Sequence, residues 1–594
     1  MKQFFKFATA SCLGVFLAGI VLILVFGVGV GSMVSSLNKK PTIKSNSVLK
    51  LDLTQPIPEK TNNTESQEFS LENNSIVGVH DMVKAIEQAK TDSKIKGILL
   101  DLSFVQAGTV TRKELRDALI DFKESDKFIY AYSKNYFQNA YHLATAADKI
   151  FLNPLGSVEF GGYAANISFY KRMLDKIGVE MQVYYAGNFK GASEPYRLEK
   201  LSDPNRMQIR QYINDLYDNL LEDVSESRNK SKQELRKIAN EYLARTPEDA
   251  VKYGLIDEVA YFDEVISAMK SSLGLEEDDK LNVTTMQSYS KGVDSDIDLK
   301  VKDRIAVVFA EGTINTGVSA PGGIGDDKYT KIIRKLRKDD KVKAIVMRVN
   351  SGGGSALASE NIWRELVLAK EQGKVVVASM GDVAASGGYY ISAMADKILA
   401  EESTITGSIG VFSMIPNAKE LFNDKLGITL DTVLTGEMAN GIYGVLVEPH
   451  NAKQKKILQQ QTEQMYEIFL KRVADGRGMT RDEVHEVAQG RVWTGNRALA
   501  NGLIDEIGDL EKSIATAAEL AGLEKYRVKE YPFIKDPVEQ LMDKLTGQDK
   551  KDDKIEAMIQ KSALKEYYPI YKTLKELENM KGVQARMPFS LEVH

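Results

Sequence analysis

The chain has 594 residues, which is enough for three or four domain-sized units, and a mild formal net charge of -5. This charge gives no electrostatic reason to expect a nucleic-acid partner. The single cysteine, Cys12, excludes an internal disulfide framework and a cysteine-rich metal site. The five histidines show no metal-ligand spacing, so we expect neither a metal nor a cofactor.

The first segment of the chain is apolar. Residues 7–34 carry no charge, and the run between Lys6 and Lys39 is long enough to cross a bilayer as one helix. The sequence therefore predicts an N-terminal membrane anchor over residues 1–38. Small residues near the end of the run leave cleavage as a signal peptide as a second option. Lysines flank the run on both sides, so charge alone does not orient it.

The rest of the chain alternates strand-like and helix-like patterns, which predicts an α/β fold. A polar stretch at 276–302 predicts a linker between a first unit at 46–275 and a second unit at 303–525. Residues 526–594 are rich in lysine and glutamate at helical spacing, which predicts a charged helical tail. The strand patterns lie at 48–53, 97–102, 127–132, 149–152 and 305–309, and the helical patterns at 115–122, 140–147 and roughly 205–245.

Two identical blocks indicate that the units repeat each other. Residues 147–150 and 395–398 both read ADKI, and residues 254–258 and 502–506 both read GLIDE. The members of each pair are 248 residues apart, so chance is a poor explanation. The sequence therefore predicts a duplicated domain.

A serine stands where a strand pattern gives way to a helical one. The apolar run 375–377 leads to the sequence AASGG, in which Ser386 precedes helical spacing. Free N–H groups and the positive end of a helix dipole favour a developing oxyanion there, and glycines allow a substrate to approach closely. A second glycine-rich turn at 350–355 could supply a further donor. Each turn alone is common in α/β domains, but together they suggest acyl-transfer chemistry.

The repeat indicates where a base for this serine lies. The 248-residue offset places Gln138 opposite Ser386, so the first copy lacks the nucleophile. The first copy instead holds Lys190, and the corresponding stretch around 436–440 has no lysine. A lysine can act as general base for serine if burial lowers its pKa from about 10.4 towards neutrality. We therefore predict a Ser–Lys dyad that is divided between the two copies.

Four motifs are specific enough to point to a family. They are FKGASEPY around Lys190, MGDVAASGGYY around Ser386, STITGSIGV around Ser408 and GRVWTGNRALANGLIDEIG from Gly490. Over about 46–525 the chain resembles the bacterial signal peptide peptidase A family, in its long, duplicated, membrane-anchored form. The fold implied by this resemblance is the ClpP/crotonase type, built from repeated β-β-α units in two tandem domains.

The resemblance also implies roles for individual residues. Ser386 would be the nucleophile and Lys190 the general base, while Ser408 would orient the lysine amine. The oxyanion donors would be the backbone N–H groups of Gly354 and Gly387. A glycine here replaces the proline of the family's N-S-P-G-G turn, which makes the turn more flexible.

The implied activity is that of a serine endopeptidase that degrades cleaved signal peptides and other apolar peptides. It would sit in the bacterial inner membrane, with its N-terminus in the cytoplasm and its catalytic body in the periplasm. Its partners would be those peptides, the lipid around the anchor, and further copies of the chain in a homo-oligomer, with a tetramer as the first choice.

The residues leave three alternatives open. A Ser–His enzyme would use His142 or His450 as its base. A crotonase-like enzyme acting on acyl-CoA would share the oxyanion hole but would need neither an exposed serine nor an anchor. A catalytically inactive membrane scaffold is disfavoured, because Ser386 and Lys190 are both retained in separate copies.

Overall fold

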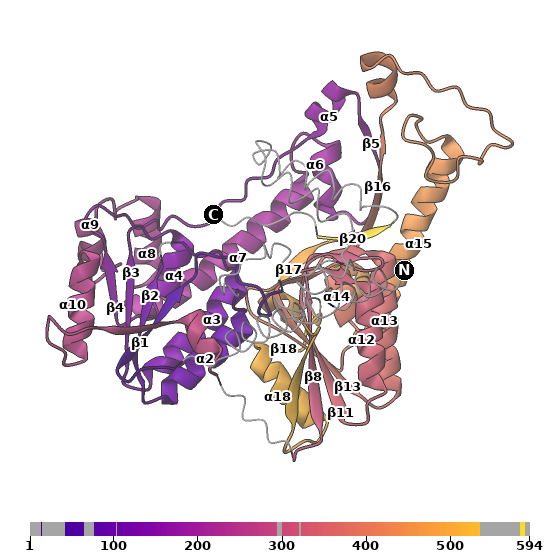
Figure 1. The fold of residues 1–594 in the computed structure, drawn as a ribbon. Helices are drawn as coiled ribbons and strands as arrows, with labels where there is room; N and C mark the ends of the chain where they lie inside the picture. Colours follow the sequence, from indigo (N-terminus) through magenta and orange to yellow (C-terminus); the bar gives the residue numbers. More distant parts are fainter. Residues whose placement is uncertain are drawn as a thin grey trace, which may run out of the picture.

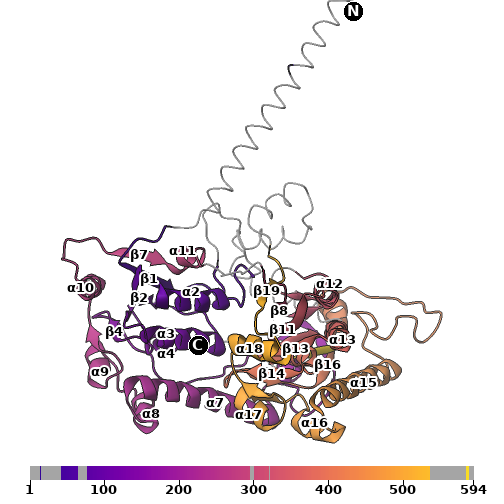
Figure 2. The same cartoon turned by 90° about the horizontal axis from the view of Figure 1, so that it is seen from below.

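The computed structural model describes residues 14, 42–63, 76–102, 104–293, 300–319, 322–534 and 583–587. They form two α/β units side by side, with the long helix α7 (Asp203–Arg228) running from the first towards the second (Figure 1; Figure 2). The predicted α/β class is confirmed. The anchor expected over residues 1–38 lies, apart from Gly14, outside the described residues. Among the helices described, none combines the length and the apolar character needed to cross a bilayer.

The first unit is built on a wholly parallel, six-stranded sheet in the order β6-β4-β3-β2-β1-β7. Helices cover this sheet, so its strands carry apolar residues at successive positions, as in Ile98–Leu100. The sheet consists of β1 (Ser47–Asp52), β2 (Ile95–Asp101), β3 (Phe128–Ser133), β4 (Lys149–Leu152), β6 (Glu258–Val259) and β7 (Asn282–Thr285). The helices are α2 (Val79–Thr91), α3 (Thr109–Lys123), α4 (Gln138–Ala144), α5 (Lys171–Ile177), α6 (Glu194–Arg197), α7, α8 (Lys232–Asn240), α9 (Pro247–Lys252), α10 (Phe262–Ser272) and α11 (Met286–Ser290).

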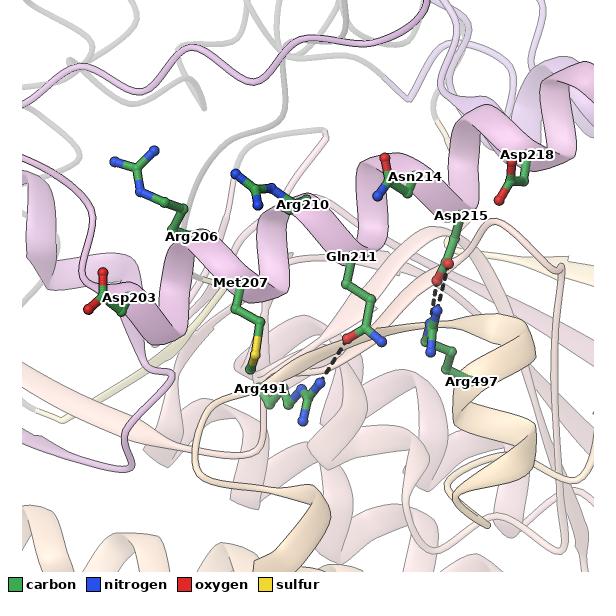
Figure 3. Close-up of a pocket in the computed structure, with 10 residues that line it drawn as sticks. All are labelled: Asp203, Arg206, Met207, Arg210, Gln211, Asn214, Asp215, Asp218, Arg491 and Arg497. Atoms are coloured by element: carbon green, nitrogen blue, oxygen red, sulfur yellow. Dashed lines mark hydrogen bonds and ion pairs between the residues drawn. The ribbon is translucent and has the colours of Figure 1, made fainter. Parts of the chain in front are cut away.

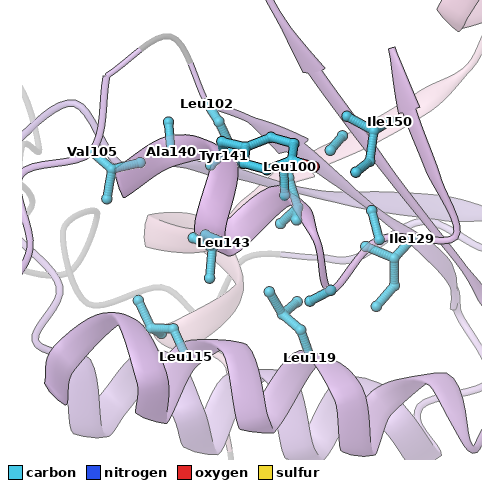
Figure 4. Close-up of a cluster of buried hydrophobic side chains, with 14 of the residues drawn as sticks. Leu100, Leu102, Val105, Leu115, Leu119, Ile129, Ala140, Tyr141, Leu143 and Ile150 are labelled. Atoms are coloured by element: carbon cyan, nitrogen blue, oxygen red, sulfur yellow. The ribbon is translucent and has the colours of Figure 1, made fainter. Parts of the chain in front are cut away.

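The core of the first unit lies between this sheet and helix α3. Leu115 and Leu119 on α3 face Leu100, Ile129 and Ile150 of three neighbouring strands (Figure 4). All five side chains are fully buried. The apolar stripe of the helix therefore fixes how α3 lies on the sheet.

The stretch expected to be a linker, 276–302, is in part an element of the first unit. Its residues 282–285 form β7, which pairs in parallel with β1 and completes the edge of the sheet. Helix α11 follows directly and packs Met286 and Tyr289 into the core. The polar composition predicted a linker because an edge strand buries only part of its side chains and can therefore be polar.

The second unit has an eight-stranded sheet whose main path runs β17-β15-β13-β11-β8-β19, with β14 paired to β13 and β18 paired to β14. Its centre, from β8 through β11 to β13, is parallel and almost wholly buried. The strands are β8 (Arg304–Glu311), β11 (Val342–Ser351), β13 (Val375–Ala385), β14 (Lys397–Ala400), β15 (Ile405–Gly407), β17 (Val492–Thr494), β18 (Glu506–Ile507) and β19 (Arg527–Tyr531). The helices are α12 (Asp326–Arg337), α13 (Ala356–Glu371), α14 (Gly387–Ser392), α15 (Ala452–Arg477), α16 (Arg481–Val487), α17 (Gly495–Ala500) and α18 (Leu510–Leu520).

The repeated blocks of the sequence make the same contacts in both units. Tyr141 donates a hydrogen bond to the Leu255 carbonyl at 2.8 Å, and Tyr389 donates one to Leu503 at 2.7 Å. The aspartate of each GLIDE block accepts a hydrogen bond from the backbone N–H of the isoleucine in the ADKI block, at 2.8 Å in both units. Each GLIDE block is therefore tied both to a helix, α4 or α14, and to a strand, β4 or β14.

A third, six-stranded sheet joins the two units in the order β10-β9-β12-β20-β16-β5. Its strand β5 comes from the first unit and pairs antiparallel with β16 of the second. The stretch expected to be a helical tail, 526–594, supplies strands at both places where it is described. These strands are β19, which pairs with β8, and β20, which pairs with β12 and β16. Both segments form strands because they pair with strands that are already in place. The members of this sheet are β5 (Glu180–Ala186), β9 (Ile314–Asn315), β10 (Ile324–Gly325), β12 (Gly353–Ser355), β16 (Val411–Asn417) and β20 (Gln584–Arg586).

Buried charges hold the two units together. Arg348 on β11 is fully buried and pairs with Glu59 at 2.8 Å and with Glu114 at 2.7 Å, both from the first unit. Burial raises the pKa of Glu114 to about 8 despite this pair, since Glu59 shares the same guanidinium. On the neighbouring strand, Asp382 accepts a hydrogen bond of 2.7 Å from the Thr111 hydroxyl at the start of α3.

Replacing Arg348 by alanine should lower the free energy of unfolding by about 3–5 kcal/mol, because it leaves Glu59 buried without a counter-charge. The measurement is the urea dependence of the first unfolding transition. Arg364, whose pair with Glu371 is exposed, is the control, and its alanine variant should lose no more than about 1 kcal/mol. An equal, small loss in both variants would show that the cluster does not hold the units together.

Candidate active site

Ser386 lies at a strained junction between a strand and a helix. It follows β13 and caps α14, with φ at 57° and ψ at -114°. This conformation is unfavourable for a residue with a Cβ and persists only where the surroundings enforce it, often at functional sites. The enforcing contact is a 2.8 Å hydrogen bond from the Ser386 N–H to the Gly407 carbonyl. The whole residue is buried.

The structure brings Lys190 from the first unit to this serine. Its Nζ lies 2.8 Å from Ser386 Oγ and 3.0 Å from both the hydroxyl oxygen and the carbonyl oxygen of Ser408, which is within hydrogen-bond distance of all three. Lys190 is 1% exposed, and burial lowers the pKa of its amine well below the usual value. An amine without its extra proton has a lone pair that can accept the hydroxyl proton.

Ser408 and Lys190 are held by one loop of the second unit. The Ser408 N–H donates to the Arg491 carbonyl at 2.6 Å, and Ser408 has a positive φ of 51°. A Cβ placed on Gly490 would lie 2.7 Å from the Lys190 backbone, so glycine permits the close approach of the loop. The geometry of the lysine amine is therefore fixed from both units.

Helix α7 clamps this loop from the side of the first unit (Figure 3). Arg491 donates to Gln211 at 2.7 Å, and Arg497 pairs with Asp215 at 2.5 Å, beside a cavity of about 640 Å³. The side chain of Gln208 bonds both to the lysine loop and to the loop after Gly490. Sequence reasoning assigned these residues no role. The sequence contains one indication of their importance, which is that Arg491 and Arg497 lie within the family motif that starts at Gly490.

The two predicted oxyanion donors, Gly354 and Gly387, come from neighbouring turns. A Cβ on Gly353, which has φ of 96°, would lie 2.6 Å from the Gly387 nitrogen, so the turns are in contact. The turn is fixed by Ser351, whose hydroxyl donates to Gly312 at 2.6 Å and accepts from the Gly353 N–H at 3.1 Å. These bonds offset the flexibility expected of a glycine in place of proline.

Gln138 occupies the place of the serine in the first unit. It begins α4, just as Ser386 caps α14, but its amide closes on the adjacent backbone. The side-chain oxygen accepts from the Gly162 N–H at 2.7 Å and from the Gly161 N–H at 3.2 Å. The first copy thus retains the strand and helix that frame the site, while the Gln138 amide is engaged by the backbone of Gly161 and Gly162.

The two histidines considered as bases have other partners. His142 bonds to Asp223 at 2.8 Å, and burial lowers its pKa to about 4. His450 bonds to Tyr184 at 2.8 Å. In the part of the chain that the structure describes, neither histidine contacts Ser386.

Comparison with known proteins identifies the family. The model of Peptidase family S49 matches residues 121–276 and 368–524, which are the two copies of the repeat. A solved ClpP1 mutant from Listeria monocytogenes covers 35% of this chain at 16% identity, with a TM-score of 0.24 that is too low to carry an argument about the fold.

Three relatives match the chain over most of its length. "Protease 4" of Salmonella typhi is 38% identical over 79% of this chain and 76% of its own. "Protease 4" of Haemophilus influenzae is 36% identical over 75% and 73%, and "Serine protease SPPA, chloroplastic" of Arabidopsis thaliana is 32% identical over 86% and 74%. With two family regions and relatives at this identity, the chain belongs to peptidase family S49, in the long form with a duplicated domain, and is a serine peptidase.

Proposed function

We propose that the chain is an endopeptidase in which Ser386 is the nucleophile and Lys190 the general base. The observation that carries the proposal is the 2.8 Å contact between the buried Lys190 amine and the Ser386 hydroxyl. No other group could remove the hydroxyl proton at that distance among the contacts described for Ser386. Membership of a serine peptidase family supports the same assignment over an acyl-CoA enzyme or an inactive scaffold.

The proposed reaction has two halves. Lys190 takes the proton of Ser386 as Oγ attacks the peptide carbonyl, and the N–H groups of Gly354 and Gly387 stabilise the oxyanion. The lysine then gives the proton to the leaving amine, which departs from an acyl-enzyme ester. Water hydrolyses this ester with the same lysine as base, and Ser408 keeps the amine in place throughout.

We further propose that the substrates are apolar peptides, such as signal-peptide remnants, at the periplasmic face of the inner membrane. The apolar run at 7–34 supports an anchor that places the site beside such peptides, with the N-terminus in the cytoplasm. An extended peptide could pair its main chain with the strands next to the oxyanion turn. Assembly into a homo-oligomer, with a tetramer as the first choice, belongs to the same proposal and rests on the family resemblance.

Replacing Ser386 or Lys190 by alanine should each lower turnover of an apolar peptide ester by roughly three orders of magnitude or more, because the two act as one unit. The measurement is kcat/KM, with unfolding midpoints to show that both variants stay folded. Ser392→Ala on the same helix and Lys200→Ala on the surface are the matched controls and should retain activity.

Each alternative has its own outcome in this experiment. Activity that persists in Lys190→Ala would make another group the base. Activity that persists in both variants would remove Ser386 from the chemistry. An inactive unaltered protein would favour the scaffold, and binding of CoA would favour the crotonase-like enzyme.

The lowered pKa of Lys190 should give the acidic limb of the pH profile. Activity should fall as pH falls through this pKa, because the protonated amine cannot accept the serine proton. Lys190→Arg should be inactive at every pH, since the guanidinium keeps its charge. An acidic limb that is unchanged in a weakly active Lys190 variant would assign it to a different group.

The same burial should reduce stability in a pH-dependent way. Below about 10.4 the unfolded lysine binds a proton that the folded lysine lacks, so stability should fall as pH decreases towards the folded pKa. Lys190→Met removes this proton uptake and should be the more stable protein at neutral pH. Thermal unfolding between neutral pH and pH 10 checks this, and an equal pH slope in both proteins would contradict it.

A further inference from the structure

A segment from near the end of the sequence fills a strand position beside the oxyanion turn. Strand β20 lies between β12 and β16 and runs antiparallel to both. Figure 1 shows it in yellow next to β16. If β20 were withdrawn, β12 and β16 would face each other across a gap one strand wide, with unpaired N–H and C=O groups on both edges. Such a gap is a binding groove for an extended peptide.

The register of β20 sets one of its residues opposite a predicted oxyanion donor. Ala585 pairs with Gly354. The Met587 N–H donates to the Gly352 carbonyl at 2.7 Å, and the Ala356 N–H donates to the Val583 carbonyl at 3.3 Å. Both bonds lie two positions from the Gly354–Ala585 pair, one on each side. Because hydrogen-bonded pairs alternate along an antiparallel ladder, that pair falls on a hydrogen-bonded position.

The carbonyl oxygen of Ala585 lies beside both glycine turns. A Cβ on Gly353 would meet this oxygen at 2.1 Å, and a Cβ on Gly387 would lie 3.2 Å from it. Only glycine leaves room for the segment to come so close. The carbonyl thus lies next to the two turns that carry the predicted oxyanion donors.

One face of the segment is apolar and buried, while Gln584 on the other face is also only 2% exposed. Ala585 is 0% exposed and belongs to the core of the second unit, against which Val583 also packs. Alternate residues of a strand share a face, so Val583 and Ala585 both point into the protein. In peptidase terms Ala585 holds the position before the scissile bond, and Arg586 holds the one after it.

We propose that Val583–Met587 is a substrate bound in cis, and that the chain cuts itself between Ala585 and Arg586. This rests on the proposed function. Ser386 Oγ would attack the Ala585 carbonyl carbon while its proton passes to Lys190. The Ala585–Arg586 bond breaks, and the proton moves to the new amino group of Arg586. Water then hydrolyses the ester, which leaves a carboxylate at Ala585 and restores the serine hydroxyl.

The intact mass of the purified full chain tests this proposal. The unaltered protein should lose the peptide Arg586–His594 on incubation, while Ser386→Ala should keep it. Hydrolysis of an apolar peptide ester is measured on the same samples. If the ester is hydrolysed and the chain stays whole, self-cleavage is overturned and the proposed function stands. If neither occurs, both fail.

A pair of charge variants separates occupancy of the groove from general damage. Ala585→Glu places a carboxylate where no water reaches, so the segment should leave the groove and remain uncut. Its ester hydrolysis should equal or exceed that of the unaltered protein. Phe533→Glu adds the same charge at a residue 79% exposed and should still be cut. Cleavage of Ala585→Glu at the same rate would overturn the assigned register.

Mixing tests whether the segment acts in cis. Active protein is incubated with Ser386→Ala, and the mass of the inactive chain is followed. The inactive chain should stay whole, and the cleavage rate of the active chain should not change on dilution. Loss of Arg586–His594 from the inactive chain would overturn the cis assignment.

Discussion

The structure depends on one buried amine. Lys190 is brought by the first unit into the interior of the second, where it meets two serine hydroxyls and is almost wholly excluded from water. An ammonium ion in that place is unfavourable, so burial lowers the pKa of the amine and favours its neutral form. The same burial that suits the lysine to the proposed role of a base also makes it a burden on stability.

Several contacts between the two units keep Lys190 beside Ser386. Arg348 ties the end of β11 to two carboxyl groups of the first unit, and α7 holds the loop that carries Arg491. Strand β5 leads to Lys190 and is itself part of a sheet with β16. Neither unit therefore contains both Lys190 and Ser386, and loss of the interface would separate the two residues.

The duplicated domain gives this division a physical meaning. Both copies retain the tyrosine and aspartate contacts that close each sheet. Only the second copy retains the strained serine and the glycine turn, whereas the amide of Gln138 is satisfied by its neighbours. The strand position between β12 and β16, which β20 fills, lies beside this site, at the point where the glycines permit close approach.

The sequence alone determined the features that depend on local pattern. Apolar runs indicated the α/β class, and the two exact blocks indicated the duplication. The first copy lacks the serine and the second copy lacks the lysine, which pointed to Ser386 and Lys190 as a pair. These features follow from residue type and spacing, which can be read directly from the linear sequence. The motifs added Ser408 and the two glycines, and the structure places all of them together.

Only the tertiary structure decided what depends on pairing between distant segments. Residues 282–285 became a strand because the sheet had an edge position beside β1, and residues 584–586 became β20 because they pair with β12 and β16 on either side. The depth to which Lys190 is buried, and hence the direction of its pKa, depends on a loop some three hundred residues further along. Backbone edges and burial are properties of the folded chain, and neither is encoded in the composition of the segment that uses them.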